Sequence, residues 1–278
     1  MPEGDTIFRT ATVLRRALVG GVMRRAVARP GPGISRVPDL SVLVGASVTA
    51  VESRGKHLLI GFSGGRWLRT HMRMRGSWHR YAPGERWRLP QRRAVCVLET
   101  DTAVAVCFDA PVVELLSSVV LDRHAGLRAL GPDLLGASPD LDEAVRRLRE
   151  REAMALGEAL LDQRAVAGIG NVVKSEALFM ERLDPWAPVS AHTDDQLQAV
   201  VGRASALLRA NTGGGRRVTT GRRSPGDSLW VYGRSGRPCR RCGSLIRSRR
   251  QGEQARTTYW CPTCQAAAPA GTTTPAAR

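Results

Sequence analysis

The chain has 278 residues, of which 42 are Lys or Arg and 25 are Asp or Glu, so its formal net charge is +17. An apolar content of 42% is ordinary for a globular protein and excludes wholesale disorder. The basic excess predicts a polyanionic partner, and nucleic acid is the most common one. A membrane surface is the alternative, but the sequence has no basic amphipathic helix and no apolar run of about 18 residues.

The first part of the chain predicts one helix followed by strands. Asp5 is a favourable N-cap, and apolar residues recur at helical spacing up to Gly20 and Gly21, which predicts a helix over residues 5–19. From about residue 22 to 120, short apolar segments are separated by turns rich in Gly, Pro and Arg. The clearest are Val42–Val51, His57–Phe62, Ala94–Leu98 and Ala103–Phe108. Such segments predict an antiparallel β-sandwich or barrel.

The second half predicts helices and then a basic loop. Helical periodicity covers Leu141–Arg151, Met154–Leu161, the segment from Asn171 to Arg182, and Thr193–Arg209. Residues 211–228 are rich in Gly, Arg, Ser and Thr and predict a mobile loop. The expected α+β organisation is a β-sandwich domain (1–125), a linker (126–138), a helical domain with the basic loop (139–230), a zinc finger (231–265) and a disordered tail (266–278).

Four cysteines form two Cys-x-x-Cys pairs near the C-terminus, Cys239 with Cys242 and Cys261 with Cys264. Two such turns supply four thiolates for one tetrahedral Zn²⁺, and a set of four leaves no open position, which predicts one structural zinc. Four free thiols or two disulfides are the alternatives. The chain starts with acidic residues where a signal peptide would be basic, so we expect the reducing cytoplasm, where metal binding is favoured.

Arginine is concentrated around these cysteines. Between Arg203 and Arg256 there are 14 arginines and only two acids, Asp227 and Glu253. The segment between the cysteine pairs is expected to form a hairpin that carries Arg247, Arg249, Arg250 and Arg256. A solvated charged face usually mixes both signs, so this segment predicts phosphate binding.

The start of the chain offers a nucleophile. Removal of Met1 would expose the secondary amine of Pro2. An α-amino group near pKa 8 is about one-tenth unprotonated at neutral pH, whereas a lysine is unprotonated to less than about one part in a thousand. Attack on a sugar C1′ would yield an iminium ion that acts as an electron sink, and the adjacent Glu3 could protonate the ring oxygen. Proline at position 2 is common, however, and alone carries little weight.

Four stretches in a fixed order add a resemblance that covers nearly the whole chain except its tail. They are MPEGDTIFRTA at the start, SRGKHLLI at 53–60, GIGNVVKSEALF at 168–179, and the cysteine module with RTTYWCPTCQ. Together they resemble the Fpg/Nei family of bacterial DNA glycosylases and abasic-site lyases. The resemblance implies a monomeric base-excision repair enzyme that acts on damaged double-stranded DNA without contact with a membrane; whether it also acts on single strands stays open.

The resemblance also implies roles for individual residues. Pro2 matches the Schiff-base nucleophile, Glu3 the ring-oxygen acid, and Lys56 the lysine near the lesion phosphate, whose charge favours the free amine on Pro2. Asn171, in the turn of a helix–two-turn–helix, matches a phosphate ligand, as does Arg256 in the zinc hairpin. Lys174 on the following helix joins the expected DNA contacts, and Glu176 matches a glutamate that we interpret as structural.

A glycosylase that extrudes a nucleotide needs side chains to fill the gap in the stack. The turn from His71 to Gly76 matches the family's wedge, with Met74 inserted and Arg73 and Arg75 beside it. The alternative, Met74 in the core, conflicts with two flanking arginines that need water or phosphate. His57 and His71 are expected to pack or contact phosphate, and Cys96 and Cys107 to lie in the core.

Three departures place the chain on the Nei (endonuclease VIII) side. Thr6 stands where typical members have a second early glutamate, for which Asp5 is a partial replacement. The stretch from Asp109 to Val112 lacks the arginine and phenylalanine of the Fpg loop that contacts the opposite strand. The loop over about 213–230 is short. We therefore expect oxidised pyrimidines as substrates. An Fpg-type purine glycosylase and a non-catalytic zinc-ribbon DNA-binding protein are the alternatives; opposite base and δ-elimination stay open.

Overall fold

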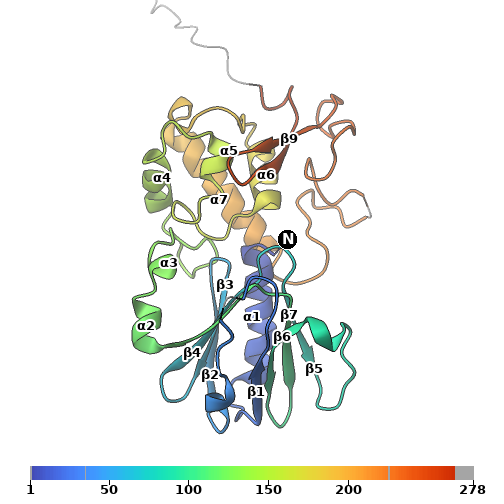
Figure 1. The fold of residues 1–278 in the computed structure, drawn as a ribbon. Helices are drawn as coiled ribbons and strands as arrows, with labels where there is room; N and C mark the ends of the chain where they lie inside the picture. The colour runs from blue at the N-terminus through green and yellow to red at the C-terminus, as the bar shows by residue number, and fades with distance from the viewer. Residues whose placement is uncertain (1, 35, 225, 267–278) are drawn as a thin grey trace, which may run out of the picture.

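A computed structural model describes residues 2–34, 36–224 and 226–266 of the chain. Two domains are stacked along one axis, with the strands of residues 25–117 in the lower half of Figure 1 and most helices, together with the C-terminal hairpin (residues 247–260), in the upper half. Apart from Ala266, the predicted disordered tail lies outside the described residues. Within the described residues, none of the helices combines the length and apolar character needed to cross a bilayer.

The first helix, α1 (Gly4–Leu18), runs along the sandwich and reaches up to the second domain (Figure 1). It is amphipathic, and its buried apolar side chains join the core of the sandwich. The prediction of a helix here is confirmed, but that of Asp5 as its N-cap is wrong. Glu3 is the N-cap residue, and Asp5 is buried in the first turn.

The predicted β-sandwich is confirmed as two four-stranded antiparallel sheets. One sheet has the order β1 (Arg25–Ala28), β6 (Ala94–Glu99), β7 (Val104–Phe108) and β5 (Ser77–Tyr81). The other has the order β2 (Val48–Arg54), β3 (His57–Phe62), β4 (Arg66–His71) and β8 (Val112–Ser117). Cys96 and Cys107 face each other across β6 and β7, fully buried as predicted. The predicted strand from Val42 starts as a single 3₁₀ turn (Ser41–Leu43) and becomes a strand only at Val48.

The segment predicted as a linker over 126–138 is packed. After α2 (Ser118–Asp122) it contains most of α3 (Ala125–Arg128), and Leu134 and Leu135 are buried in the core of the helical domain. Gly131 lies so close to the next domain that a Cβ there would be 2.3 Å from the carbonyl oxygen of Ala165. The segment is therefore part of the second domain, because its few leucines find partners that are distant in sequence.

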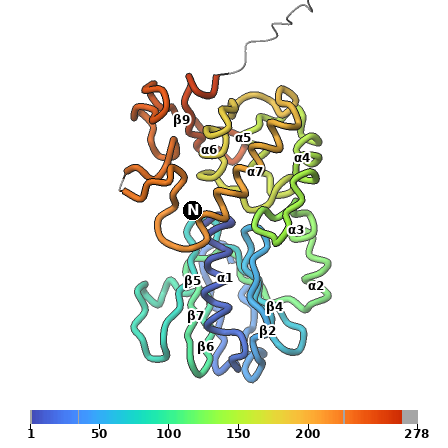
Figure 2. The backbone as a smooth tube through the Cα atoms, turned by 180° about the vertical axis from the view of Figure 1, so that it is seen from behind, coloured from blue at the N-terminus to red at the C-terminus, as the bar shows by residue number. Residues whose placement is uncertain are grey.

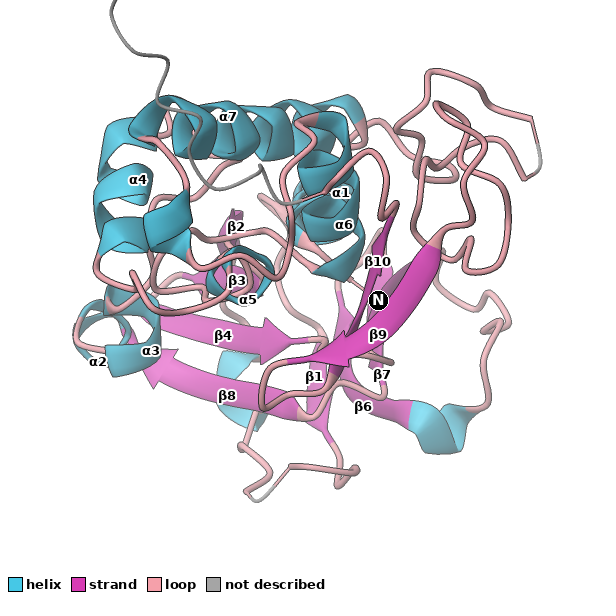
Figure 3. Ribbon diagram, turned by 90° about the horizontal axis from the view of Figure 1, so that it is seen from above, coloured by secondary structure: helices cyan, strands magenta, loops and turns pink. Residues whose placement is uncertain are grey.

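The helical domain contains α4 (Leu141–Arg149), α5 (Leu156–Ala159), α6 (Asn171–Met180) and α7 (Asp194–Ala210). Asp140 caps α4, and Thr193 with Gln196 forms a capping box on α7. α7 packs against α4 and α6 (Figure 3). All residues of α6 except the last are buried, so this helix forms the centre of the domain.

Between α7 and residue 247 the described residues form no helix or strand, but hydrogen bonds hold this segment in place. The buried carboxylate of Glu176 on α6 accepts hydrogen bonds from the backbone N–H groups of Trp230 (2.8 Å), Val231 (2.9 Å) and Tyr232 (2.8 Å). It also accepts one from the hydroxyl of Thr219. These contacts support the structural role expected for Glu176, and the prediction of a freely mobile loop is wrong for the part held by them.

The expected zinc-module hairpin is formed by β9 (Arg247–Gln251) and β10 (Arg256–Trp260), paired antiparallel. It lies beside α6 (Figure 3), because Asn171 and Lys174 on that helix contact β10. Arg249 stacks on Trp186, with its guanidinium carbon 3.7 Å from the ring centroid. The hairpin is therefore fixed to the helical domain, and its arginine-rich strand β9 is exposed except at Gln251.

Candidate active site

The start of the chain is inserted into the turn that precedes α6. The N–H of Gly4 donates to the carbonyl oxygen of Gly168 at 2.9 Å. The buried carboxylate of Glu3 accepts from the N–H groups of Val172 (2.8 Å) and Val173 (3.2 Å), in the first turn of α6. A helix N-terminus has unpaired N–H groups and a positive dipole end, so it stabilises a carboxylate there.

This insertion requires glycine in the GIGN turn. A Cβ at Gly170 would lie 2.3 Å from the carboxyl carbon of Glu3, and Gly168 has a φ of +101°. The turn is held from behind by Gln163, which accepts from Gly168 N–H and donates to the Ile169 carbonyl, both at 3.1 Å. The GIGN turn (residues 168–171) is therefore the socket that receives Glu3 and Gly4 at the start of the chain.

Lys56 lies at the turn between β2 and β3 and reaches the same socket, where its Nζ donates to the carbonyl oxygen of Ile169. The N–H of the adjacent Gly55 donates to Asp133 at 2.7 Å, which holds this turn against the helical domain. Burial lowers the pKa of Lys56 to about 8, while Glu3 acts to raise it and Arg256 to lower it. The ammonium is thus still charged at neutral pH.

Asn171 and Lys174 contact the hairpin. The Asn171 amide donates to the carbonyl of Thr257 at 2.6 Å, and its buried Oδ1 has no partner among the described residues. Lys174 is fully buried and donates to the hydroxyl of Thr258 at 2.6 Å. Burial lowers the pKa of Lys174 to about 7. Its position contradicts the predicted DNA contact, because an ammonium without exposed surface cannot reach a phosphate; it positions β10 instead.

Arg256 and the wedge turn come together from opposite domains. Arg256 begins β10, and its Nη1 lies 2.9 Å from the sulfur of Met74. Met74 is 53% exposed, so it is not a core residue, and Arg73 and Arg75 beside it are also exposed. Arg73 has a φ of 47°, a left-handed conformation that sharpens the turn. The arrangement leaves an apolar tip between cationic side chains.

The two histidines at this end of the sandwich pack on each other. The register of β3 and β4 places His57 opposite His71, and their ring centroids are 4.7 Å apart. Burial, followed by nearby charges, lowers the pKa of His57 to about 2 and that of His71 to about 4. Both rings are therefore neutral at pH 7, and Nδ1 of His71 accepts from the backbone N–H of Arg73 at 3.1 Å, which supports the turn from His71 to Gly76.

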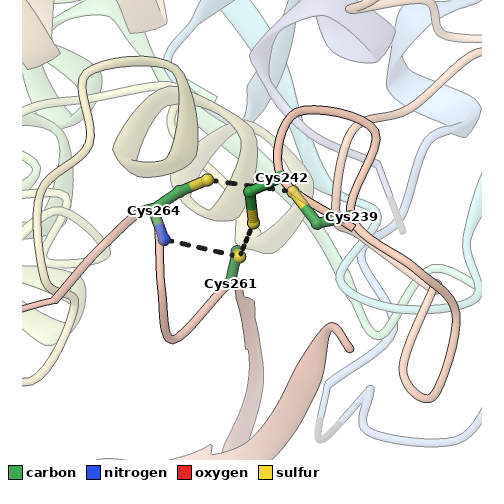
Figure 4. Close-up of side chains that lie close together, drawn as sticks. All are labelled: Cys239, Cys242, Cys261 and Cys264. Carbon is green, nitrogen blue, oxygen red and sulfur yellow. Dashed lines mark hydrogen bonds between the residues drawn. The ribbon is translucent and has the colours of Figure 1, made fainter. Parts of the chain in front are cut away.

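The four predicted cysteine ligands form one cluster (Figure 4), with their sulfur atoms all within 4.8 Å of one another. The sulfurs of Cys239 and Cys264 are 3.9 Å apart, and those of Cys242 and Cys261 are 3.5 Å apart. Disulfide sulfurs lie at about 2.05 Å, so these are not disulfides. Sulfurs that share a tetrahedral zinc with bonds of about 2.3 Å lie about 3.8 Å apart, so the cluster fits that metal.

The contact between Arg217 and Asp5 is not predicted by any sequence motif. Arg217, from the basic loop, forms a two-point ion pair with Asp5, with N–O distances of 2.6 and 2.5 Å. Thr6 instead lines a cavity of about 270 Å³ together with Arg9 and Arg80. Residues 5 and 217 are far apart in the sequence and belong to no common motif, so this contact is found only in the folded structure.

Comparison with protein-family models supports the resemblance inferred from the motifs. Residues 1–111 match the formamidopyrimidine-DNA glycosylase N-terminal domain. Residues 130–220 match the formamidopyrimidine-DNA glycosylase H2TH domain. The second match begins inside the segment predicted as a linker, in agreement with its packing into the helical core.

Individual relatives extend the match to nearly the full chain. A protein of Streptomyces coelicolor called probable endonuclease 8 2 is 44% identical, over 96% of this chain and 94% of its own. A protein of Mycolicibacterium smegmatis called DNA-(apurinic or apyrimidinic site) lyase Nei2 is also 44% identical, over 96% and 100%. A formamidopyrimidine-DNA glycosylase of Laribacter hongkongensis is 35% identical, over 82% and 86%.

Solved structures have the same fold. The MutM (Fpg) protein of Thermus thermophilus superimposes with a TM-score of 0.77 at 27% identity, over 96% of this chain and all of the other. A Lactococcus lactis Fpg solved with DNA gives a TM-score of 0.80 at 21% identity, over 95% and 100%. With relatives at 44% identity over nearly its full length, the chain belongs to the Fpg/Nei family of DNA glycosylases and abasic-site lyases.

Proposed function

We propose that this protein removes oxidised bases from DNA and then cuts the abasic strand, with the amine of Pro2 as nucleophile. The observation that carries the proposal is the seating of Glu3 on the N-terminus of α6. This contact places the start of the chain beside Lys56, at the junction of the two domains. The contact therefore fixes the residue next to Pro2 at this junction.

The chemistry follows from a secondary amine beside an acid. The Pro2 nitrogen bonds to C1′ as the damaged base leaves and takes up a proton from solvent. The proton that the nitrogen then loses passes to the Glu3 carboxylate, which delivers it to the ring oxygen as the ring opens. This leaves an iminium ion, which withdraws electrons from C2′. Removal of a proton from C2′ then expels the 3′ phosphate and breaks the strand. Water releases the sugar fragment and regenerates the amine.

DNA is proposed to lie across the junction of the two domains. Lys56 and Arg256 come to this junction from opposite domains, and both contribute positive charge for the phosphates that flank the extruded nucleotide. The side-chain amide of Asn171, at the start of α6, adds a hydrogen-bond donor. Met74, with Arg73 and Arg75 beside it, is the wedge that fills the gap.

We further propose that the cysteine cluster holds one structural Zn²⁺. Four thiolates complete a tetrahedral shell, so the ion stabilises the base of the hairpin and takes no part in the reaction. The hairpin carries Arg256, which links the metal to DNA affinity. We propose a monomer that works in the cytoplasm, where the thiolates stay reduced.

Oxidised pyrimidines are the proposed lesions. The stretch from Asp109 to Val112 contains no arginine, and its Asp109 forms an ion pair with Arg93 at the edge of the sandwich. Two relatives at 44% identity have names of the endonuclease 8 and Nei2 type. A purine glycosylase is the second candidate, since a formamidopyrimidine-DNA glycosylase is 35% identical.

Blocking the Pro2 nitrogen tests the nucleophile. The chain with Pro2 exposed, checked by intact mass, should form a borohydride-trapped adduct with abasic DNA, and the same chain with an uncleaved N-terminal extension should form none. Both should bind a non-reactive abasic analogue, because the phosphate-contacting side chains are unchanged. Equal trapping by the two would refute the mechanism, whereas no trapping by either would favour a non-catalytic DNA-binding protein.

The pKa of Lys56 predicts a pH dependence of binding. The pKa is lowered from 10.5 to about 8, so the charge is present below pH 8 and lost above it. Affinity for the abasic analogue should therefore fall as the pH rises from 7.5 to 9.5, measured by fluorescence anisotropy. Lys56→Arg keeps its charge over this range and should have a flatter profile. Parallel declines in the two proteins would show that Lys56 is not the titrating contact.

Removal of one cysteine ligand tests the metal. Cys261→Ser should release zinc, measured by a chromogenic chelator, and weaken DNA binding because the hairpin loses its base. Cys96→Ala, which changes a buried cysteine of the sandwich, is the control and should retain the metal. Full zinc content or unchanged affinity in Cys261→Ser would contradict the proposed role.

A panel of duplex and single-stranded oligonucleotides, each with one lesion, tests substrate choice. Thymine glycol and hydroxylated uracils should be excised faster than 8-oxoguanine in single-turnover assays. Preference for the oxidised purine would favour the Fpg-type alternative. An undamaged duplex of the same sequence provides the background rate.

A further inference from the structure

The ion pair between Arg217 and Asp5 lies directly behind the proposed acid. The Arg217 guanidinium holds both oxygens of Asp5, and its Nη1 is 3.8 Å from the nearer oxygen of Glu3. The exposed fractions of the three side chains are 16% for Arg217, 4% for Asp5 and 0% for Glu3. One largely buried cation is thus shared between the carboxylate of the N-cap residue and a carboxylate in the first turn of α1.

Arg217 is brought there by its own segment. Asn211 donates to the Val218 carbonyl at 2.9 Å and accepts from the Val218 N–H at 2.7 Å, which closes a loop around Arg217. Arg9 on α1 donates to the carbonyl of Gly215 at 3.3 Å. Figure 2 shows the segment after α7 (orange) passing beside the upper end of α1. Contacts on both sides of Arg217 therefore fix its position independently of Asp5.

The cost of burying the ion pair between Arg217 and Asp5 indicates that the pair serves function rather than stability. Burying an ion pair costs desolvation energy, and such pairs often contribute little net stability but hold groups in register. Burial lowers the pKa of Arg217, but Glu3, together with the hydrogen bond and charge of Asp5, raises it by more. The guanidinium is therefore charged at every pH at which the enzyme would work.

We propose that Arg217 is a positioning residue for the reaction: anchored by Asp5, it holds the Glu3 carboxylate against α6 and keeps a permanent positive charge behind it. This inference rests on the proposed function, since it assigns a role relative to Glu3 and Pro2. It also gives Asp5 a defined task. Asp5 does not replace the missing second glutamate; it orients the arginine.

The surrounding charges define what removal of this cation would do. Lys56, Lys174 and Tyr232 also interact electrostatically with Glu3. Without Arg217, the Glu3 and Asp5 carboxylates would face each other with less compensation. Loss of this positive charge would favour the protonated form of the nearby Pro2 amine, so the pH–rate profile should move to higher pH. Without Asp5, Arg217 would be undercompensated and the profile should move to lower pH.

The experiment measures single-turnover borohydride trapping on a preformed abasic site across pH 5.5 to 9.5. Arg217→Gln should slow trapping by about 10-fold to 100-fold because Glu3 loses its alignment. Its profile should move upward by about 1 pH unit, and that of Asp5→Asn downward. Arg217→Lys, which keeps the charge, should restore the profile at a reduced rate. Arg216→Gln removes an exposed charge from the same loop and is the matched control for the profile.

The outcomes separate this inference from the function on which it rests. If the unmodified chain with Pro2 exposed forms no adduct, the proposed function fails. If it does, and Arg217→Gln matches its rate within twofold with an unchanged profile, the positioning role is wrong. If the pH–rate profiles of Arg217→Gln and Asp5→Asn shift in the same direction, the pair is only a structural contact and the inference is wrong. If Arg217→Gln does not fold, the comparison of Arg217→Lys with Asp5→Asn still decides.

Discussion

The carboxylate of Glu3 on the first turn of α6 is the contact on which the rest of the structure depends. It joins the first residues of one domain to the central helix of the other. Because the carboxylate is fully buried, it needs the unpaired N–H groups and positive dipole that only a helix N-terminus offers together. Gly168 and Gly170 leave room for the first residues of the chain, so the insertion of these residues requires the two glycines of GIGN.

The same helix organises the other functional elements. Asn171 and Lys174, one turn apart on α6, contact consecutive residues of β10 directly after Arg256. Glu176 holds the backbone that leads into the cysteine module. The proposed catalytic terminus, Arg256 and the cysteine module are thus all positioned by contacts with α6. A change within this buried helix would move all of them relative to DNA.

The sequence predicted the features that depend on local pattern. The strand over His57–Phe62, the helix after GIGN and the cysteine cluster follow from period, turn residues and spacing. The sequence did not predict the features that depend on contacts between residues far apart in the chain. Lys174 looked like a DNA-binding lysine, but its side chain is covered by β10. Asp5 is a residue type that is common at helix N-caps. In the structure, however, α1 begins at Gly4 with Glu3 as its N-cap, and Asp5 forms an ion pair with Arg217. Neither pairing leaves a trace in the spacing of residues.

The location of the covalent bond tests the account most directly. After reaction with abasic DNA and reduction, proteolysis and mass spectrometry should place the sugar remnant on the peptide that begins with Pro2, at its nitrogen. A remnant on the side chain of Lys56 or Lys174, the only two lysines of the chain, would contradict the account. It would mean that the socket on α6 holds the start of the chain for stability and that a lysine amine carries out the chemistry.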